Sequence, residues 1–195
     1  MILRKATPKA IKYACMNFHY AKSVPSASFA YNVYNTNGDW CGVVIFGNGT
    51  ARQLSKNMGV WQGEVLELVR VALNGKQGYT SQAVSMALKQ LHKDAPYCKM
   101  VVSFSDHRQH HLGTIYQATN WIYLGVSVNT SKKEYLYHGK WIHPRTFDNT
   151  HAIRDTLPKR RISNKFKYVY VFDKRLRKEW NKKALPYPKD KDLTE

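Results

Sequence analysis

Acidic residues are scarce in this chain of 195 residues. Its 31 lysines and arginines face only 13 aspartates and glutamates, which gives a formal net charge of +18, and the sequence pI is about 9.9. A field of this size attracts polyanions, and nucleic acid is the polyanion that basic domains most often bind. A basic surface kept for solubility is the alternative. We therefore expect a nucleic acid, or another phosphate-rich molecule, as a partner.

Long apolar runs and paired cysteines are missing as well. No run approaches the roughly 20 residues that a membrane-spanning helix needs, and the first residues, Met1–Lys5, lack the apolar core of a signal peptide. Cys15, Cys41 and Cys98 are odd in number and form no CxxC pair, which favours free thiols in a reducing compartment. We expect a cytoplasmic protein, in the host cytoplasm if it is viral, without membrane association.

The hydrophobic content of 43% suits one compact domain, which we expect over residues 1–185, followed by a loose proline-bearing tail, residues 186–195. Hydrophobic periodicity and turn residues predict, in order, a helix (8–21), a hairpin (28–34 with 40–46), a strand (64–73), a helix (80–92) capped by Thr80 or Ser81, a strand (99–104), a helix (113–124) and strands at 134–137 and 168–172. Residues 143–165 are expected to form a long basic loop with some helix. This order predicts an α/β (α+β) fold with one mixed sheet flanked by helices.

The basic charge is densest in the last part of the chain. Residues 126–195 contain 18 lysines and arginines and 8 acidic residues, against 13 and 5 in the first 125. Phosphate contacts position a protein on DNA without reading its sequence. We predict such contacts from the basic stretch around residues 174–178 and from five cations: Lys159, Arg160, Arg161, Lys165 and Lys167.

A glycine-bearing loop follows the strand predicted at 64–73 and opens the next helix. Backbone N–H groups in such a loop, and at the helix N-terminus after it, favour phosphate. The residues with this character are Gly75, Lys76, Gly78, Thr80 and Ser81. An ordinary strand–helix turn is the alternative, because neither a Walker pattern nor a full GxGxxG is present.

The segment from Ser103 to Gly125 is the richest in polar chemistry. Asp106 directly follows a predicted strand, and ligands gather beyond the carboxyl ends of strands in open sheets. In the predicted helix that follows, Tyr116, Asn120 and Tyr123 share one face, which indicates a polar pocket or a half-exposed surface. A metal site is a further alternative, assembled from the nearby histidines with Asp106 or His19: His107, His110 and His111.

Six segments carry a resemblance to a known family. They are HYAKSVP (19–25), GEVLELVRVALNG (63–75), TSQAVSMALK (80–89), SFSDHRQHHLGTIYQATNWIYLG (103–125), HPRT (143–146) and KFKYVYVFDK (165–174). In this order, over nearly the whole chain, they resemble the Mom family of phage DNA modification proteins. The most specific segment is GTIYQATNW.

The resemblance implies a fold like that of the GNAT acyltransferases, with a helix after the central splayed strand. It also implies conversion of adenine in double-stranded DNA to N6-carbamoylmethyladenine, which shields phage DNA from host restriction. By position, five residues match those of the family's active site: Asp106, Tyr116, Arg70, His19 and Tyr20. The glycine loop lacks the full acetyl-CoA pattern of ordinary GNAT enzymes, so the donor stays open between acetyl-CoA and a related molecule. Iron is a further cofactor suggested by the family.

The amino group of adenine is a weak nucleophile inside the base stack, so the base must be flipped out. We expect Asp106 to orient or deprotonate this amine, Tyr116 to donate a hydrogen bond or a proton to the leaving group, and Arg70 to hold an anionic part of the donor. Asn120 and Tyr123 are expected to contact DNA. The candidates for stacking on the flipped base are Tyr20, Trp121 and Tyr123, with core packing as the alternative for Trp121.

Two other classes of function fit parts of the sequence. An acyl-CoA-dependent N-acetyltransferase acting on a protein or a small amine would explain the glycine loop, and a non-catalytic DNA-binding protein would explain the charge. The expected partners are double-stranded DNA and a small-molecule donor. The oligomeric state stays open, with a homodimer as one option.

Overall fold

The computed structural model describes residues 1–49, 53–106, 109, 111–127, 133–142, 154, 156–162 and 164–190. Its elements follow in the order β1 (Ile2–Lys5), α1 (Pro8–Phe18), β2 (Phe29–Tyr34), β3 (Trp40–Gly47), α2 (Leu54–Met58), β4 (Val65–Leu73), α3 (Thr80–Asp94), β5 (Met100–Asp106), α4 (Thr114–Gln117), β6 (Ile122–Ser127), β7 (Lys133–Tyr137), β8 (Lys140–Ile142), β9 (Lys159–Arg161), β10 (Lys165–Val171) and α6 (Lys174–Asn181).

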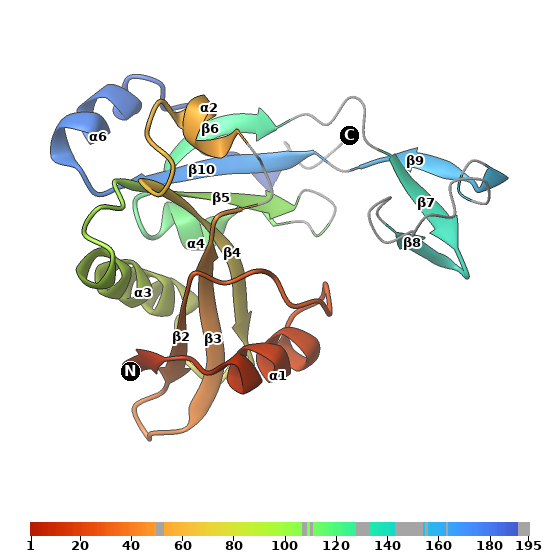
Figure 1. Cartoon of the computed structure of the whole chain (residues 1–195), viewed down its shortest axis with the longest axis horizontal. Helices are drawn as coiled ribbons and strands as arrows, with labels where there is room; N and C mark the ends of the chain where they lie inside the picture. Colours follow the sequence, from red (N-terminus) through yellow and green to blue (C-terminus); the bar gives the residue numbers. More distant parts are fainter. Residues whose placement is uncertain are drawn as a thin grey trace.

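The centre of the molecule is a seven-stranded sheet in the order β1-β2-β3-β4-β5-β10-β6 (Figure 1). Its pairs are antiparallel except for β4 with β5, which are parallel. The predicted hairpin is β2–β3, and its turn is held by the Asn35 Oδ1, which accepts from the N–H groups of Asn37 and Asp39 at 3.0 and 2.9 Å. The predicted mixed sheet flanked by helices is confirmed.

Helices cover both faces of the sheet. On one face, Ala14 and Cys15 of α1 pack against buried residues of β3 and β4, and Thr7 caps α1 by accepting from the Ala10 N–H at 3.3 Å. On the other face α3 buries the stripe that contains Val84, Leu88 and Leu91. The polypeptide therefore forms three layers, and none of the described helices is long and apolar enough to cross a membrane.

The parallel strands β4 and β5 separate before they end. They pair only between Val65–Glu67 and Met100–Val102, and β4 then continues to Leu73 while β5 continues to Asp106. In Figure 1 the two strands diverge strongly beyond this point. We call the region between these diverging strand ends the gap between β4 and β5. In open α/β sheets, ligands bind at the carboxyl ends of the strands.

A β-bulge in β4, beside this gap, changes the face of the sheet to which the following side chains point. Ile45 lies opposite Arg70 and Phe46 opposite Leu68, so Val69 is an extra residue on β4. Bulges interrupt the alternation of side chains along a strand. Arg70 consequently lies on the α1 side of the sheet, close enough to Cys15 to affect the pKa of its thiol.

The helix predicted at residues 113–124 is wrong. The helix α4 covers only Thr114–Gln117, the backbone turns at Asn120 with φ of 59°, and Ile122 begins strand β6. The segment is a strand because it pairs with β10, where Tyr123 lies opposite Tyr168. Tyr116, Asn120 and Tyr123 therefore do not share one helical face.

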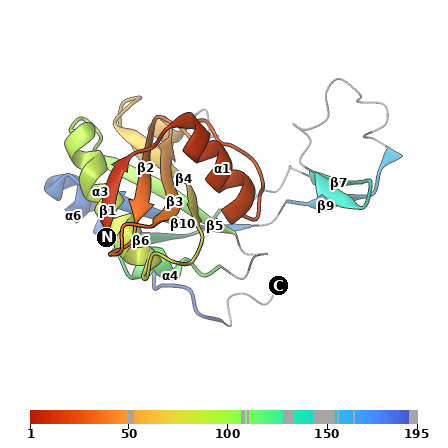
Figure 2. The same cartoon turned by 90° about the horizontal axis from the view of Figure 1, so that it is seen from below.

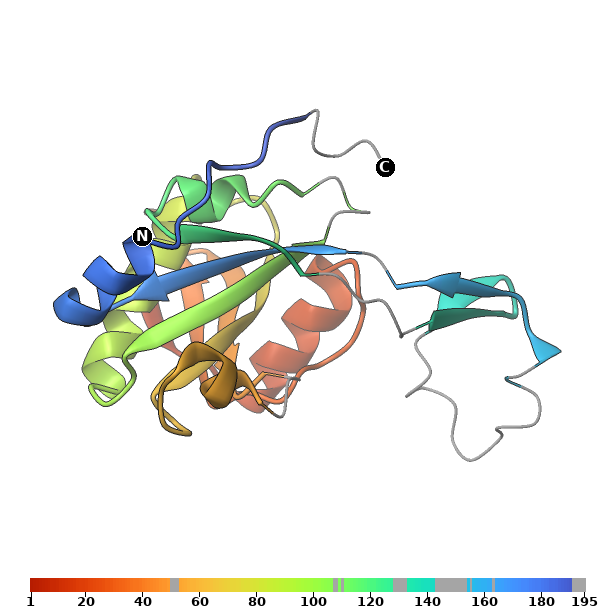
Figure 3. The same cartoon turned by 90° about the horizontal axis from the view of Figure 1, so that it is seen from above.

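Several elements were not predicted from the sequence: β1, α2, β8, β9 and α6. Strands β8 and β9 pair with β7 in a separate antiparallel sheet of order β8-β7-β9, which we call the β-arm. The chain enters the β-arm after β6 and leaves it into β10. Figures 1, 2 and 3 all show it projecting from the body of the molecule.

Part of the predicted loose tail is packed against the core. The Tyr187 hydroxyl donates to the Trp121 carbonyl at 2.6 Å, and Pro188 is buried. The last residues, 191–195, lie outside the described part of the chain.

Candidate active site

The hydroxyl of Tyr116 lies at the gap between β4 and β5. The Ser103 hydroxyl is 2.8 Å from it and 3.0 Å from the Leu68 carbonyl oxygen. A hydroxyl has one proton to donate, so when Ser103 donates to the carbonyl, Tyr116 donates to Ser103. Burial raises the pKa of Tyr116 to about 12, and this phenol therefore stays protonated at neutral pH.

The segment after α1 brings Tyr20 to the same place. The Tyr20 ring lies 4.3 Å from the His19 ring and 6.1 Å from the His111 ring, measured between centroids. Its pKa is raised, first by burial and then by the negative charge of Asp106, while Arg70 lowers it. Because Tyr20 also raises the pKa of Tyr116, these groups form one electrostatic neighbourhood.

His19 is held as a neutral hydrogen-bond donor. Burial and the positive charges of Arg70, His111 and Lys22 lower its pKa to about 4. Its Nδ1 accepts from the Ala21 N–H at 3.1 Å. In a neutral imidazole the other nitrogen then carries the proton, so His19 presents an Nε2–H.

The segment after α1 accepts a hydrogen bond from one of the N–H groups of Arg70. Its Nη2 donates to the Ser23 hydroxyl at 3.2 Å. Its Nε is buried and has no hydrogen-bond partner among the residues that the structure describes. A buried donor without an acceptor is unfavourable by about 1–3 kcal/mol, and a bound anionic group would relieve that cost.

Two cations of β10 lie beside Asp106. Lys165 is the cross-strand partner of Asp106, and Lys167 is the partner of Phe104, so both lysines lie on the same face as the carboxylate. Burial lowers the pKa of Lys167. The structure thus places two of the five cations predicted to contact phosphate next to Asp106.

Sequence reasoning missed two residues of this neighbourhood. Glu67 ends the paired part of β4 and raises the pKa of Tyr116 by its negative charge. It was detectable as the only acidic residue in the apolar strand Val65–Leu73. Ser103 had no comparable signal, because a serine between the apolar residues of β5 is equally typical of a packed strand.

Two predicted DNA contacts lie elsewhere, and the prediction for Tyr123 is wrong. Tyr123 is buried and packs against Tyr168 with ring centroids 5.2 Å apart, because its side chain points from β6 into the core. Asn120 is exposed on another groove, where its carbonyl accepts from Arg177 Nη2 at 2.7 Å. Trp121 is buried in the core, which was the alternative expected for it.

The predicted phosphate loop joins β4 to α3. Gly75 and Gly78 have φ of +87° and +80°, and a Cβ at either position would meet nothing within 4 Å. The N-cap of α3 is Tyr79, one residue before the predicted Thr80, and its side chain makes no capping hydrogen bond. Thr80 Oγ1 instead accepts from Gln77 Nε2 at 2.9 Å. The loop therefore has open space over its glycines.

A groove of ≈ 730 Å³ begins at this helix end. Ser81 contributes to it from the predicted loop set, together with residues of α3, the turn after α4 and β10, which include Tyr79, Gln82, Ser85, Asn120 and Tyr170. Lys76 and the two glycines do not line it. The groove is distinct from the neighbourhood of Tyr116 and Asp106.

The described residues give no support to a metal. No group of three or more His, Cys, Asp or Glu within them could hold an ion. Two of the histidines considered for such a site, His107 and His110, lie outside the described residues, whereas His111 lies beside Tyr20.

Among the β-arm cations, Arg160 differs from its neighbours. Its Nε is 2.9 Å from Glu134 Oε2, and its guanidinium lies 4.2 Å above the Trp141 ring. Lys159 and Arg161 are exposed and point to the opposite face, since neighbouring residues alternate along a strand.

Solved acetyltransferases share this architecture. An acetyltransferase from Bacillus subtilis in complex with CoA is 10% identical, with a TM-score of 0.53 and coverage of 88% of this chain and 98% of that chain. A ribosomal-protein-S5-alanine acetyltransferase from Vibrio fischeri is 13% identical, with a TM-score of 0.51 and coverage of 88% and 93%. These similarities show the GNAT acetyltransferase fold that the resemblance implied.

Sequence comparison points to a narrower group. The chain is 31% identical over 121 residues to the methylcarbamoylase mom of Escherichia phage Mu, which covers 56% of this chain. The match takes in 49% of that relative, so the chain spans about half the length of the protein it matches. The model of the Mom protein family matches residues 1–189. The chain therefore belongs to the Mom protein family.

Proposed function

We propose that this protein is a transferase that converts adenine in double-stranded DNA to N6-carbamoylmethyladenine and thereby protects phage DNA from host restriction. The observation that carries the proposal is that Tyr20 lies close enough to Asp106, Arg70 and Tyr116 for their charges to interact, beside the gap between β4 and β5. The family supports the same reading.

The chemistry assigns a role to each of these groups. The N6–C bond forms while the bond between the methylene carbon and the leaving group breaks, and the N6 proton passes to Asp106. Tyr116, protonated because its pKa is about 12, donates a hydrogen bond to the leaving group while it accepts one from the Ser103 hydroxyl, which then no longer donates to the Leu68 carbonyl. Arg70 holds an anionic part of the donor.

The base itself would be received by the half-exposed Tyr20. Its ring is 52% exposed and is supported from behind by His19. Stacking on such a ring is worth about 1–3 kcal/mol per base, which offsets part of the cost of flipping. Lys165 and Lys167 lie on the same face as Asp106 and would bind the phosphates that flank the flipped nucleotide.

A CoA-type donor fits the loop between β4 and α3. The open space over Gly75 and Gly78 and the N-terminus of the 15-residue helix α3, which lacks a side-chain cap, suit a pyrophosphate. Lys76, Thr80 and Ser81 would add a charge and two hydroxyls. Since N6 bonds to the methylene carbon, the carbamoylmethyl group would be carried on the donor's sulfur, and the thiolate would be the leaving group. The loop would only hold and orient the donor.

Mass spectrometry of plasmid nucleosides from expressing cells tests the proposal. We expect the mass of carbamoylmethyladenine with the wild type and its loss with Asp106→Asn and Tyr116→Phe. Tyr13→Phe, an exposed tyrosine of α1, is the matched control and should retain modification. Unmodified adenine with the wild-type protein and a supply of host donors would contradict the proposal.

A second candidate function has support from the fold alone. The similarity to CoA-bound and amine-acetylating enzymes fits an acyl-CoA-dependent N-acetyltransferase acting on a protein or a small amine. The same experiment separates the two, because such an enzyme would leave adenine unmodified and add an acetyl group to an amine. A protein that binds DNA without chemistry would give neither product.

A further inference from the structure

The β-arm has two faces of different character. Residues directly opposite each other on paired strands project to the same face. Glu134 lies opposite Arg160 and Leu136 opposite Trp141. On this face Arg160 forms its ion pair with Glu134 and stacks on Trp141, so its positive charge is balanced within the β-arm.

The other face is strongly positive. The remaining cross-strand pairs are Lys133 with Arg161, Tyr135 with both Lys159 and Ile142, and Tyr137 with Lys140. The four cations of these pairs are all exposed, whereas Tyr135 between them is buried, and no acidic residue of the three strands lies on this face. We call these seven residues the cationic face.

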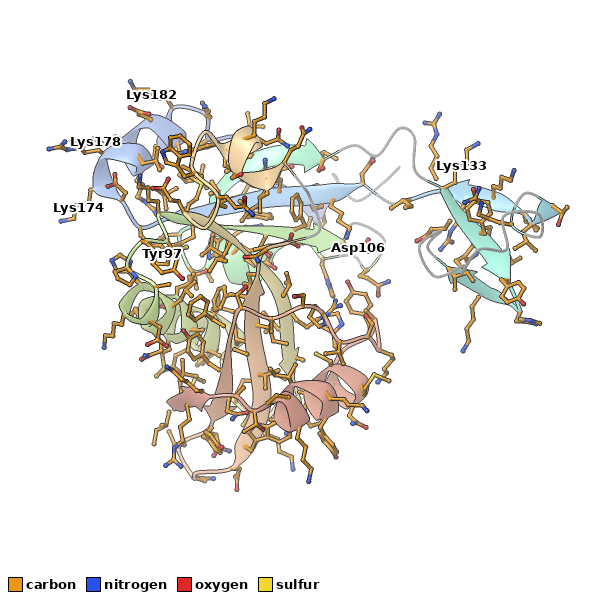
Figure 4. All side chains as sticks on the ribbon, in the orientation of Figure 1. Tyr97, Asp106, Lys133, Lys174, Lys178 and Lys182 are labelled. Atoms are coloured by element: carbon orange, nitrogen blue, oxygen red, sulfur yellow. The ribbon has the colours of Figure 1, made fainter. Side chains whose placement is uncertain are left out.

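The β-arm is attached directly beside the candidate active site. β9 ends at Arg161 and β10 begins at Lys165, the cross-strand partner of Asp106. Four residues of extended chain span at most about 14 Å, so the cationic face begins within that distance of the strand end. Figure 4 shows Asp106 at the end of the body that faces Lys133, with α6 at the far end.

We infer that the β-arm is a clamp for the phosphate backbone of duplex DNA, which it contacts through the cationic face while a base is presented at Asp106. This inference rests on the proposed function for its choice of DNA as the polyanion. Cations on an arm separate from the body can meet phosphates that a compact domain does not reach. The exposed cations of this face thus extend the footprint on DNA beyond the modified nucleotide.

The residue types indicate that this contact is independent of sequence. Lysine is a point charge that binds phosphate, whereas bases are read by amides and bidentate arginines. The cationic face has three lysines and no amide side chain among its residues. The arm would therefore supply affinity and register, and the site between β4 and β5 would supply the choice of base.

The test compares two triple variants that remove the same charge. One replaces Lys133, Lys140 and Lys159 of the arm by Gln. The other replaces Lys174, Lys178 and Lys182, which are exposed on and directly after α6 at the opposite end of the molecule (Figure 4), by Gln. The inference thus excludes the phosphate contacts around residues 174–178 that the sequence alone predicts. Both variants lower the net charge by three, so a general loss of attraction would affect them equally.

Binding to a 30-base-pair duplex is followed by fluorescence anisotropy over a series of salt concentrations. Each lost phosphate contact lowers the salt slope by about 0.9, so we expect the arm variant to lose two to three units of slope and at least 10-fold in affinity. The α6 variant should lose less than half a unit. Equal losses, or a slope of the arm variant equal to that of the wild type, would overturn the inference, as would tighter binding of a single-stranded RNA of the same length.

Failure of the proposed function gives a different pattern. If the wild type leaves adenine unmodified but binds duplex DNA in an arm-dependent way, the inference stands and the proposed reaction falls. If the wild type modifies adenine and the arm variant binds and modifies DNA as the wild type does, the proposed reaction stands and the inference about the β-arm falls. Circular dichroism of both variants checks that the exposed substitutions leave the fold intact.

Discussion

The Ser103 hydroxyl lies 2.8 Å from the Tyr116 hydroxyl and joins it to the Leu68 carbonyl of the neighbouring strand. This link crosses the place where β4 and β5 stop pairing. The Tyr116 ring also packs against the rings of Trp121 and Tyr168, with centroids 5.0 Å apart in each pair. The hydrogen bond and the packing together fix the phenol at the gap.

Removing this link should impair the reaction more than the fold. Ser103→Ala deprives Tyr116 of its buried partner, so we expect at least a 10-fold loss of adenine modification and a loss of about 1–2 kcal/mol in the free energy of unfolding. Ser105→Ala is the matched control, since Ser105 is a buried serine of the same strand whose hydroxyl has no partner among the described residues. Nucleoside mass spectrometry measures the modification, and urea unfolding measures the stability. Equal modification by the two variants would show that Ser103 is not part of the site.

His19 should make the protein sensitive to acid. Its pKa is about 4 in the folded state, below the ordinary value of 6.5, so the unfolded state binds more protons between these values. Stability is therefore retained above pH 6.5 and falls as the pH drops toward 4. His19→Gln should flatten this dependence of the melting temperature, while His92→Gln on α3 should keep it. Parallel curves for wild type and His19→Gln would contradict the lowered pKa of His19.

Gly113 should tolerate no side chain. Its φ is +75°, and a Cβ there would come within 2.6 Å of the Tyr168 ring and 2.9 Å of the Tyr116 ring. Gly59 also has positive φ, +66°, but open space around it. Gly59→Ala should be destabilising by about 1 kcal/mol through backbone strain alone, and Gly113→Ala by about 3 kcal/mol or more through the added overlap. Denaturant unfolding of both variants separates strain from packing.

Arg70 should be irreplaceable by lysine. The guanidinium reaches Ser23 through Nη2 and keeps a further buried N–H, whereas lysine has one point of charge and a different reach. We expect Arg70→Lys to lose at least 10-fold in modification with unchanged affinity for duplex DNA. Ser23→Ala, which removes only the outer contact, should lose less, and a Lys variant with full activity would assign Arg70 to packing.

Local patterns predicted α1, the hairpin β2–β3, β4, α3 and β5. The Thr7–Pro8 start of α1, the Asn-Gly hairpin and the strand–loop–helix of residues 64–94 depend on neighbours in sequence, and each lies within a few residues of its predicted place. β6 was mistaken for a helix because Ile122 and Tyr123 become a strand only by pairing with β10, about 40 residues later. The resemblance named the site residues, but their meeting depends on the bulge at Val69 and on the divergence of β4 and β5, which no local pattern encodes.

The position of β10 between β5 and β6 has a consequence for biosynthesis. A growing chain on the ribosome can complete β1 to β5 with their helices while β10 is still unmade. β5 then has an open edge, and β6 has no neighbour, until Lys165–Val171 leaves the exit tunnel. Exposed edges of this kind invite pairing with other chains. A chain whose synthesis stops within the β-arm should therefore be prone to aggregate, because its sheet ends at the unpaired edge of β5.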